Sequence, residues 1–253
     1  MPTFWHGRNS HVLLAQYDVS SWLNNSNFQQ TMDTAETTAY GSNARSYLAS
    51  FPGGTTNLAG MFDGTAAAID PILAGLVGAT TASPLTIVPG QNAAVAVADR
   101  CFVCPAFLSS YNVSSPVNDV VSVTADLTYS ARMGSGRILC NVAAAAASVA
   151  NPNTTPNEAD FVASSTGGFT ATLHMTANTR DAGSIAIKVQ DSADGTTYAD
   201  VAGAPTFTSV NFGVLSGQTI QFSGTVRQWL GVSFTVTAGT TGGYSFIVGA
   251  SKF

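Results

Sequence analysis

The chain has 253 residues, of which 45% are hydrophobic and only 9% are charged. This composition excludes intrinsic disorder, and its neutral surface suits a subunit packed among other subunits better than a free monomer. The net charge is −5 and the nine basic residues are scattered from Arg8 to Lys252, which disfavours tight binding to nucleic acids.

The first eight residues lack the apolar core of a signal peptide, and no apolar run approaches the roughly 20 residues of a membrane span. We therefore expect a protein that is made in the cytoplasm and does not insert into membranes. Residues 1–17 and the segment from about Gln30 to Pro52 show no regular period, so both are expected to be unstructured.

One short helix is expected between Asp70 and Val77. Asp70 suits an N-cap and Pro71 suits the first turn, while Ile72, Leu73, Leu76 and Val77 fall on one helical face. Gly78 can end the helix in a left-handed conformation.

The strongest pattern in the chain is the alternation from Val121 to Ala131. Odd positions are apolar or aromatic, and even positions are Ser, Thr or Asp. A period of two over eleven residues predicts one long strand with a buried face and a wet face. The segment from Asn92 to Val103 is also expected to be extended.

A change of composition between Asn141 and Gly168, toward Ala, Asn, Pro, Thr and Ser, predicts a linker or a long surface excursion. We therefore divide the chain into a β domain at residues 1–145, a linker at 146–168 and a second β domain at 169–253. Beyond the linker, alternation predicts strands at Phe169–Thr176 and Ile185–Val189, a further strand around Ile220 and Phe222, and a hairpin joining Leu230–Val236 to Tyr244–Ala250.

Few residues in the sequence suggest metal binding or catalysis. The Cys101-x-x-Cys104 pair and Cys140 favour buried thiols over a zinc site, because no second cysteine pair exists. Asp191, Asp194 and Asp200 surround one turn and favour turn chemistry over calcium binding. His174 falls on the polar side of its strand, which favours a solvated or interface residue over a catalytic base. We expect no enzyme, no bound metal and no cofactor.

Several short motifs appear in order in the first half of the chain: Asp18–Leu23, Asp33, Thr37–Arg45 and Gly60–Gly64. They resemble the tail tube protein of long, non-contractile-tailed bacteriophages over residues 10 to 140. The later half resembles a second β module of related phage proteins at 171–177, 187–195 and 224–230, although Arg227-Gln228-Trp229-Leu230 departs from that family's usual Arg-Tyr-hydrophobic step.

The resemblance implies a mainly β fold: a sandwich or barrel-like tail-tube domain with one short helix, followed by a C-terminal β-sandwich. It also implies a virion structural protein, assembled in the host cytoplasm, whose rings of six copies stack into a hollow tail tube for DNA ejection. Asp119 and Asp126 are then the candidates for facing the lumen, and residues 1–17 and 30–52 would reach neighbouring rings. The implied partners are other copies of the chain and the tape-measure, tail terminator and distal tail proteins, with DNA passing through unbound.

Two other functions remain open at this stage. The C-terminal sandwich could make the chain a glycan-binding module, with Trp229, Tyr198 or Tyr244 stacking on sugars, although aromatic residues in a sandwich more often belong to the core. Alternatively, the chain could be a capsid or tail-completion protein that forms one closed ring without stacking.

Overall fold

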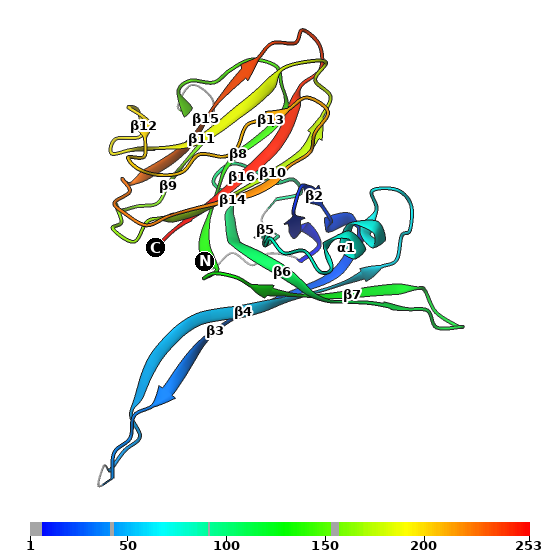
Figure 1. Ribbon diagram of the computed structural model, residues 1–253, viewed down its shortest axis with the longest axis vertical. Helices are drawn as coiled ribbons and strands as arrows, with labels where there is room; N and C mark the ends of the chain where they lie inside the picture. Colours follow the sequence, from blue (N-terminus) through cyan, green and yellow to red (C-terminus); the bar gives the residue numbers. More distant parts are fainter. Residues whose placement is uncertain (1–6, 41–42, 91, 153–156) are drawn as a thin grey trace. The chain divides into compact units, whose positions relative to one another are not determined.

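The computed structural model describes residues 7–40, 43–90, 92–152 and 157–253 and confirms the mainly β fold (Figure 1). The chain divides into two compact units that are discontinuous in sequence. Unit 1 comprises Met1–Ser21, Ser83–Cys104 and Gly134–Phe253, and unit 2 comprises Trp22–Ala82 and Pro105–Met133. Strand β6 (Arg100–Ser114) begins in unit 1 and continues into unit 2.

Unit 2 is built on an antiparallel sheet in the order β3–β4–β7–β6, with β3 at Leu23–Glu36, β4 at Tyr47–Met61 and β7 at Ser122–Tyr129. In β7 the side chains of Val123, Ala125, Leu127 and Tyr129 are buried. Thr124, Asp126 and Thr128, which lie between them, are exposed, so the predicted one-sided strand is confirmed from Ser122 to Tyr129, slightly shorter than the predicted Val121–Ala131.

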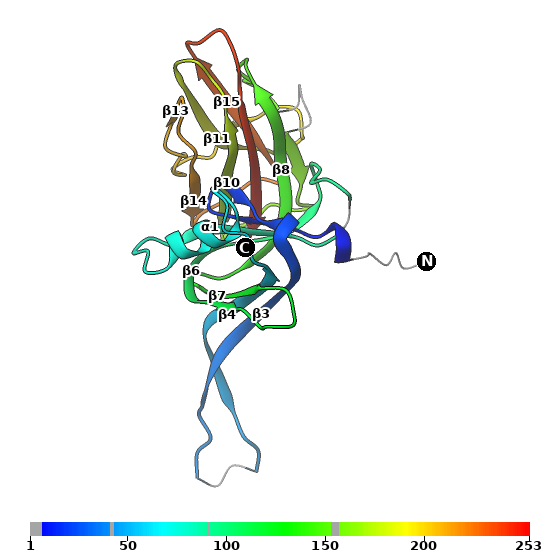
Figure 2. The same cartoon turned by 90° about the vertical axis from the view of Figure 1, so that its right-hand side faces the viewer.

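The expectation of an unstructured segment at 30–52 is wrong. β3 and β4 pair from Leu23 with Gly60 to Glu36 with Tyr47, and the pairing of β4 with β7 spans only Thr55–Met61 (Figure 2). Most of this hairpin is exposed on both faces, so its sequence lacks the alternation that reveals a half-buried strand. Backbone pairing alone defines it.

The short helix is present as α1 (Ile69–Leu76), with Ile72 and Leu73 buried as expected. The expected cap is wrong, because Ala68 occupies the N-cap position without a side-chain hydrogen bond and Asp70 lies in the first turn. Val77 is exposed rather than buried. Gly78 has φ +77°, in agreement with the expected left-handed end.

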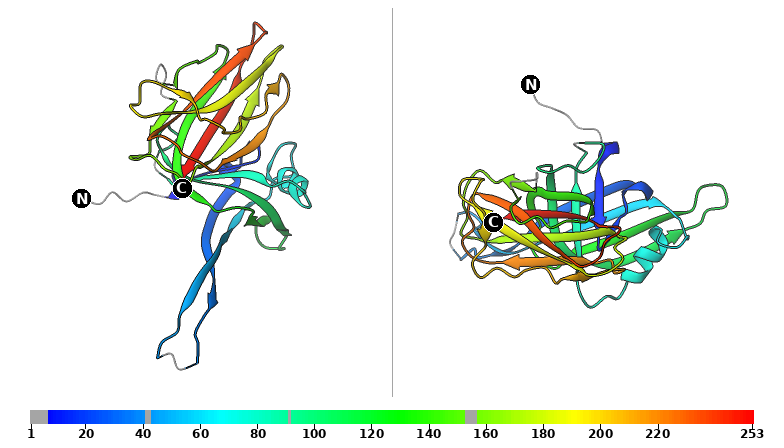
Figure 3. Two further views of the ribbon diagram at one scale, coloured as in Figure 1. Left: turned by 60° about the vertical axis from the view of Figure 1, so that its left-hand side comes forward. Right: turned by 90° about the horizontal axis from the view of Figure 1, so that it is seen from above.

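Unit 1 is a sandwich of two antiparallel sheets (Figure 3). The first sheet has the order β14–β10–β16–β8–β6–β5–β1–β2, where β14 is Gly217–Phe222, β10 Phe169–Asn178, β16 Tyr244–Lys252, β8 Gly134–Ala145, β5 Ser83–Val88, β1 His11–Leu14 and β2 Tyr17–Asp18. The second has β12 (Ala199–Asp200), β11 (Ser184–Ser192), β15 (Trp229–Thr237) and β9 (Glu158–Asp160), with β13 (Val210–Asn211) also on β11.

Residues of both sheets form one apolar core, which includes Phe169, Leu173, Leu230, Phe234 and Phe246. The rings of Phe234 and Phe246 meet edge to face with their centroids 5.2 Å apart. The predicted strands at Ile185–Val189 and around Ile220 are confirmed as β11 and β14.

Strands β15 and β16 do not form the expected hairpin. β15 pairs with β11 and β9, whereas β16 pairs with β10 and β8 in the other sheet. The alternation is the same whether two strands pair or face one another, so it could not decide between them. The buried Arg180 holds the connection by donating to the carbonyls of Ala238, Gly239 and Gly242.

Residues 146–168 are tied to the sandwich rather than being a simple connection. β9 pairs with β15, Val149 pairs with Phe234 and Ser165 pairs with Val226. The division at residues 145 and 169 stays a prediction about which segments fold alone. Residues 1–6 lie outside the described residues, but β1 is paired with β5, so 11–14 are not an unstructured arm. The segment 92–99 is irregular, and only Arg100–Val103 is extended as expected.

Candidate functional site

The exposed side of the unit 2 sheet forms a continuous polar face. The strand registers align its residues in rows across β3, β4, β7 and β6. Amides and hydroxyls dominate these rows: Asn25, Asn27, Gln29, Thr55, Asn57, Ser110, Asn112, Thr124 and Thr128. Ala59, Met61 and Phe107 add apolar area, and no Lys or Arg occurs in residues 23–36, 47–61, 105–114 or 122–129.

Asp126 occupies the middle of this polar face. Its carboxylate accepts hydrogen bonds from Ser110 Oγ at 2.6 Å and from Asn57 Nδ2 at 2.7 Å. The hydrogen bond from Ser110, followed by that from Asn57, lowers the pKa of Asp126, so the group stays ionised on a surface without cations. Asp119 lies apart, in the exposed turn between β6 and β7, where it accepts from the backbone N–H of Val120 at 2.7 Å.

Two of the motifs noted in the sequence meet in unit 2. Trp22 Nε1 donates to Asp63 Oδ2 at 3.0 Å, and Asp63 Oδ1 accepts from the backbone N–H and hydroxyl of Thr65. A Cβ at Gly60 would lie 2.3 Å from the carbonyl oxygen of Trp22, so this glycine permits the close approach of β3 and β4. The Trp22 and Gly60–Gly64 motifs therefore form one structural joint.

The hairpin of β3 and β4 carries exposed apolar side chains where it continues past β7. Met32, Tyr47 and Leu48 are 56%, 55% and 64% exposed. A two-stranded hairpin is marginal in water by itself, and exposed apolar side chains on it favour contact with another surface.

His174 is fully buried, so its predicted position on a solvated surface is wrong. Its Nδ1 donates to the carbonyl oxygen of Ala15 at 2.7 Å, and its Nε2 lies 2.8 Å from Thr86 Oγ1. Since the carbonyl can only accept, the hydrogen lies on Nδ1 and the Thr86 hydroxyl donates to Nε2. Burial lowers the pKa of His174 to about 4, so the ring is neutral. Both faces of β10 are covered, which the alternation did not reveal.

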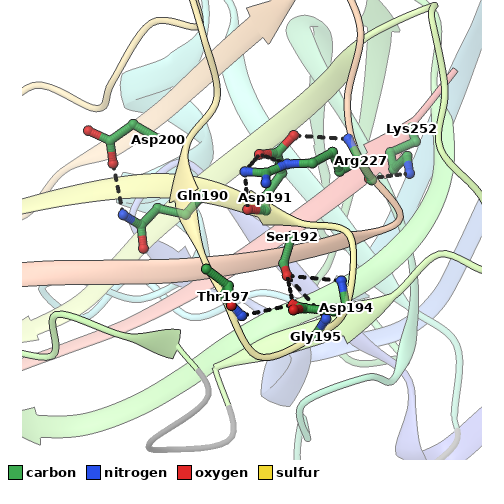
Figure 4. Close-up of polar contacts among 9 residues, drawn as sticks. All are labelled: Gln190, Asp191, Ser192, Asp194, Gly195, Thr197, Asp200, Arg227 and Lys252. Carbon is green, nitrogen blue, oxygen red and sulfur yellow. Dashed lines mark hydrogen bonds and ion pairs between the residues drawn. The ribbon is translucent and has the colours of Figure 1, made fainter.

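The three acids around the turn after β11 have separate structural roles (Figure 4). Asp191 accepts from Arg227 Nε at 2.8 Å and Nη2 at 2.6 Å, and Asp200 pairs with Lys188 at 2.7 Å. Asp194 accepts from the backbone N–H groups of Thr197 and Thr196, which lower its pKa. The predicted turn chemistry is confirmed for Asp194.

The three cysteines are buried free thiols, as predicted from the sequence: Cys101, Cys104 and Cys140. Burial raises the pKa of all three, that of Cys104 to about 12, so they are unreactive at neutral pH. Among the described residues, no group of three or more His, Cys, Asp or Glu side chains is arranged to hold a metal ion. None of the helices described is both long and apolar enough to span a membrane.

A groove in unit 1 was not found by the sequence analysis. It has a volume of 490 Å³ and is lined by Val97, Ala98, Arg137, Glu158, Ala159, Asp160, Val162 and Trp229. Of these residues, only Trp229 was singled out from the sequence. The others come from three separate segments, so no spacing within the chain could have revealed them.

No family model matches the chain, and no curated protein matches it. A chain from the virion of a gene transfer agent particle aligns with 52% of this chain and 98% of its own length, at 11% identity and a TM-score of 0.41. A chain from the tube-terminating cap of the anti-feeding prophage aligns with 53% of this chain and 91% of its own length, at 14% identity and a TM-score of 0.41.

The Dit protein of phage SPP1, described as a hub of the adsorption apparatus in phages that infect Gram-positive hosts, aligns with 96% of this chain and 99% of its own length. The identity is 12% and the TM-score is 0.39. Likenesses this weak establish neither a family nor a function for the chain.

Proposed function

We propose that the chain is a structural subunit of a phage tail, which assembles with copies of itself into rings that stack as a tube for DNA. The polar face of unit 2 carries this proposal. It offers a wide exposed sheet surface of amides and hydroxyls with Asp126 as its central charge, and its four strand segments hold no Lys or Arg.

Such a surface suits the wall of a channel for DNA. A duplex carries one negative charge per roughly 1.7 Å of its axis, so lysines or arginines on the wall would bind it and slow its passage. Amides and hydroxyls stay hydrated without binding phosphate strongly, and the ionised Asp126 repels it. The polar face would therefore let DNA pass without holding it.

The hairpin of β3 and β4 supports self-assembly. Met32, Tyr47 and Leu48 are apolar and exposed in the single chain, and contact with a neighbouring copy would remove them from water. The low charge of the whole chain is also tolerated once subunits cover one another. The resemblance of residues 10 to 140 to tail tube proteins points to the same assembly.

Negative-stain electron microscopy of the purified full-length protein, over a series of rising concentrations, tests the proposal. We expect rings that stack into hollow tubes with a regular axial repeat. Single closed rings at every concentration would contradict stacking but retain ring assembly. Monomers at every concentration, with and without a tail-tip complex added as an initiator, would contradict the whole proposal.

A further inference from the structure

The turn between β6 and β7, residues 115–121, presents apolar side chains to water. Val117 is 99% exposed and Val120 is 60% exposed, and Asp119 between them is exposed as well. Strand β4 ends beside this turn with Met61, which is 56% exposed. A cluster of exposed apolar side chains around a single acid favours contact with another protein surface.

A recess opens at the base of the β3–β4 hairpin, where the hairpin continues past β7. It has a volume of 200 Å³, and Met32, Pro52 and Met133 supply its apolar lining. Gln30 Nε2 donates to the Met133 carbonyl oxygen at 3.0 Å, which ties the hairpin to the segment after β7. Sites for small molecules usually measure about 300–1,000 Å³, so a recess of this size suits a single side chain better.

The recess and the turn 115–121 carry opposite charges. Arg132 lines the recess, whereas no Asp or Glu is among the lining residues. Asp33 follows Met32 at the bulge of β3 but does not line the recess. Arg132 is exposed and has an interaction within its own chain, and its positive charge still attracts a carboxylate that comes close. The two surfaces are therefore complementary, since both are apolar and their charges differ in sign.

These two surfaces lie at opposite ends of the unit 2 sheet and cannot meet within one subunit (Figure 1). Strand β4 runs from Pro52 at the recess to Met61 at the turn, a span of about 30 Å at roughly 3.3 Å per residue. A contact between different surfaces of two copies is head-to-tail, and such contacts repeat into closed rings or open filaments. Each subunit that uses both surfaces therefore joins two neighbours.

We propose that the turn 115–121 of one copy fills the recess of a neighbouring copy. Val117 enters the recess beside Met32, and Asp119 lies beside Arg132. The inference rests on the proposed self-assembly and names the two surfaces that meet. It also gives Asp119 a role at a subunit contact rather than at the lumen, in keeping with its position apart from the polar face.

Charge reversal in the full chain tests the pairing of Asp119 with Arg132, with sedimentation velocity as the measurement. Asp119→Lys and Arg132→Glu should each raise the protein concentration needed for assembly at least about tenfold, because like charges then face one another. The double variant restores opposite charges and should recover most of that loss, which damage to the fold would not allow. Lys188→Glu, at an exposed ion pair of unit 1, is the matched control and should assemble as the native protein does.

Cysteine cross-linking shows which surfaces meet, and it decides the matter if a charge variant does not fold. The native thiols are buried, so Met32→Cys and Val117→Cys proteins each carry one accessible thiol among the described residues. When the two proteins are mixed under assembly conditions and treated with a short bismaleimide, we expect dimers that contain one copy of each. Met32→Cys mixed with Val214→Cys, an exposed valine of unit 1, should give none.

Electron microscopy of the same samples separates this inference from the proposed function. Rings or tubes without mixed dimers would overturn the contact and leave the proposed function in place. Dimers of Met32→Cys with itself would do the same, because they would show that hairpins meet one another symmetrically. A double charge variant that assembles no better than the single variants would also overturn the pairing. Failure of the native protein to form rings or tubes would contradict both proposals.

Discussion

Strands β7 and β10 have the same polar and apolar alternation, yet their polar residues have opposite roles. In β7 the polar side chains Thr124, Asp126 and Thr128 face water. In β10 the corresponding residues Thr170, Thr172 and His174 are buried. Thr86 of β5 contacts Thr172 and His174, and the carbonyl of Ala15 contacts His174. A polar strand face is a surface for function in unit 2 and part of the packed interior in unit 1.

The largest difference in unfolding free energy is expected when a carboxylate is added to the polar side of β10 and, separately, to that of β7. Thr172→Asp would bury an unpaired carboxylate and should cost about 3–5 kcal/mol of unfolding free energy or prevent folding. Thr124→Asp on β7 should change stability by about 0.5 kcal/mol at most. Urea unfolding of both variants measures the difference, and equal losses would mean that β7 is covered as well.

The buried, neutral His174 should make the unfolding free energy depend on pH. Its folded pKa of about 4 lies below the unfolded value of 6.5, so its contribution is intact above pH 6.5 and is lost as the pH falls toward 4. The loss amounts to about 3 kcal/mol at most. A His174→Gln variant, however destabilised, should lack this part of the pH dependence. Identical pH profiles of unfolding free energy for the two proteins would refute the assignment.

Two glycine substitutions in unit 2 test the close packing of Trp22 against the Gly60–Gly64 segment. Gly60→Ala should cost about 1–3 kcal/mol, because the new Cβ would lie 2.3 Å from the Trp22 carbonyl oxygen and the backbone must shift. Gly75→Ala in α1 meets no atom within 4 Å and should stabilise by up to about 1 kcal/mol. Thermal unfolding compares the two, and a neutral Gly60→Ala would show that the strands separate easily there.

The smallest effect on the single chain is expected at the hairpin. Leu48→Ser should change unfolding free energy by about 0.5 kcal/mol at most, since the side chain is 64% exposed. The same variant should raise the protein concentration at which rings form, whereas Ala193→Ser on an exposed turn of unit 1 should not. Sedimentation velocity measures both, and unchanged assembly of Leu48→Ser would exclude the hairpin from the subunit contact.

Alternation predicted the strands well, because a one-sided or buried strand repeats every two residues whatever lies beyond it. It could not show that β5 and the turn at Ala15 lie against β10, nor that β15 and β16 belong to different sheets. Those facts depend on pairing between distant segments. The hairpin of β3 and β4 was missed for the opposite reason, since a ribbon exposed on both faces leaves no hydrophobic period.

The residues of the candidate sites could be predicted only where the pattern of a single strand revealed them. Asp126 could be singled out because the period of β7 placed it on the wet side, and its neighbours Asn57 and Ser110 became known only with the strand registers. In the groove of unit 1 only Trp229 was singled out from the sequence, because the groove draws on residues up to about a hundred and thirty positions apart in the chain.

Cysteine labelling at Thr124 tests most directly whether the polar face lines a lumen. The three native thiols are buried, so a Thr124→Cys variant carries the one accessible thiol among the described residues. We predict that a maleimide coupled to a particle wider than the tube bore labels this thiol in free subunits but not in assembled tubes, whereas an exposed Ala199→Cys control is labelled in both. Equal labelling of Thr124→Cys in free and assembled protein would contradict the account.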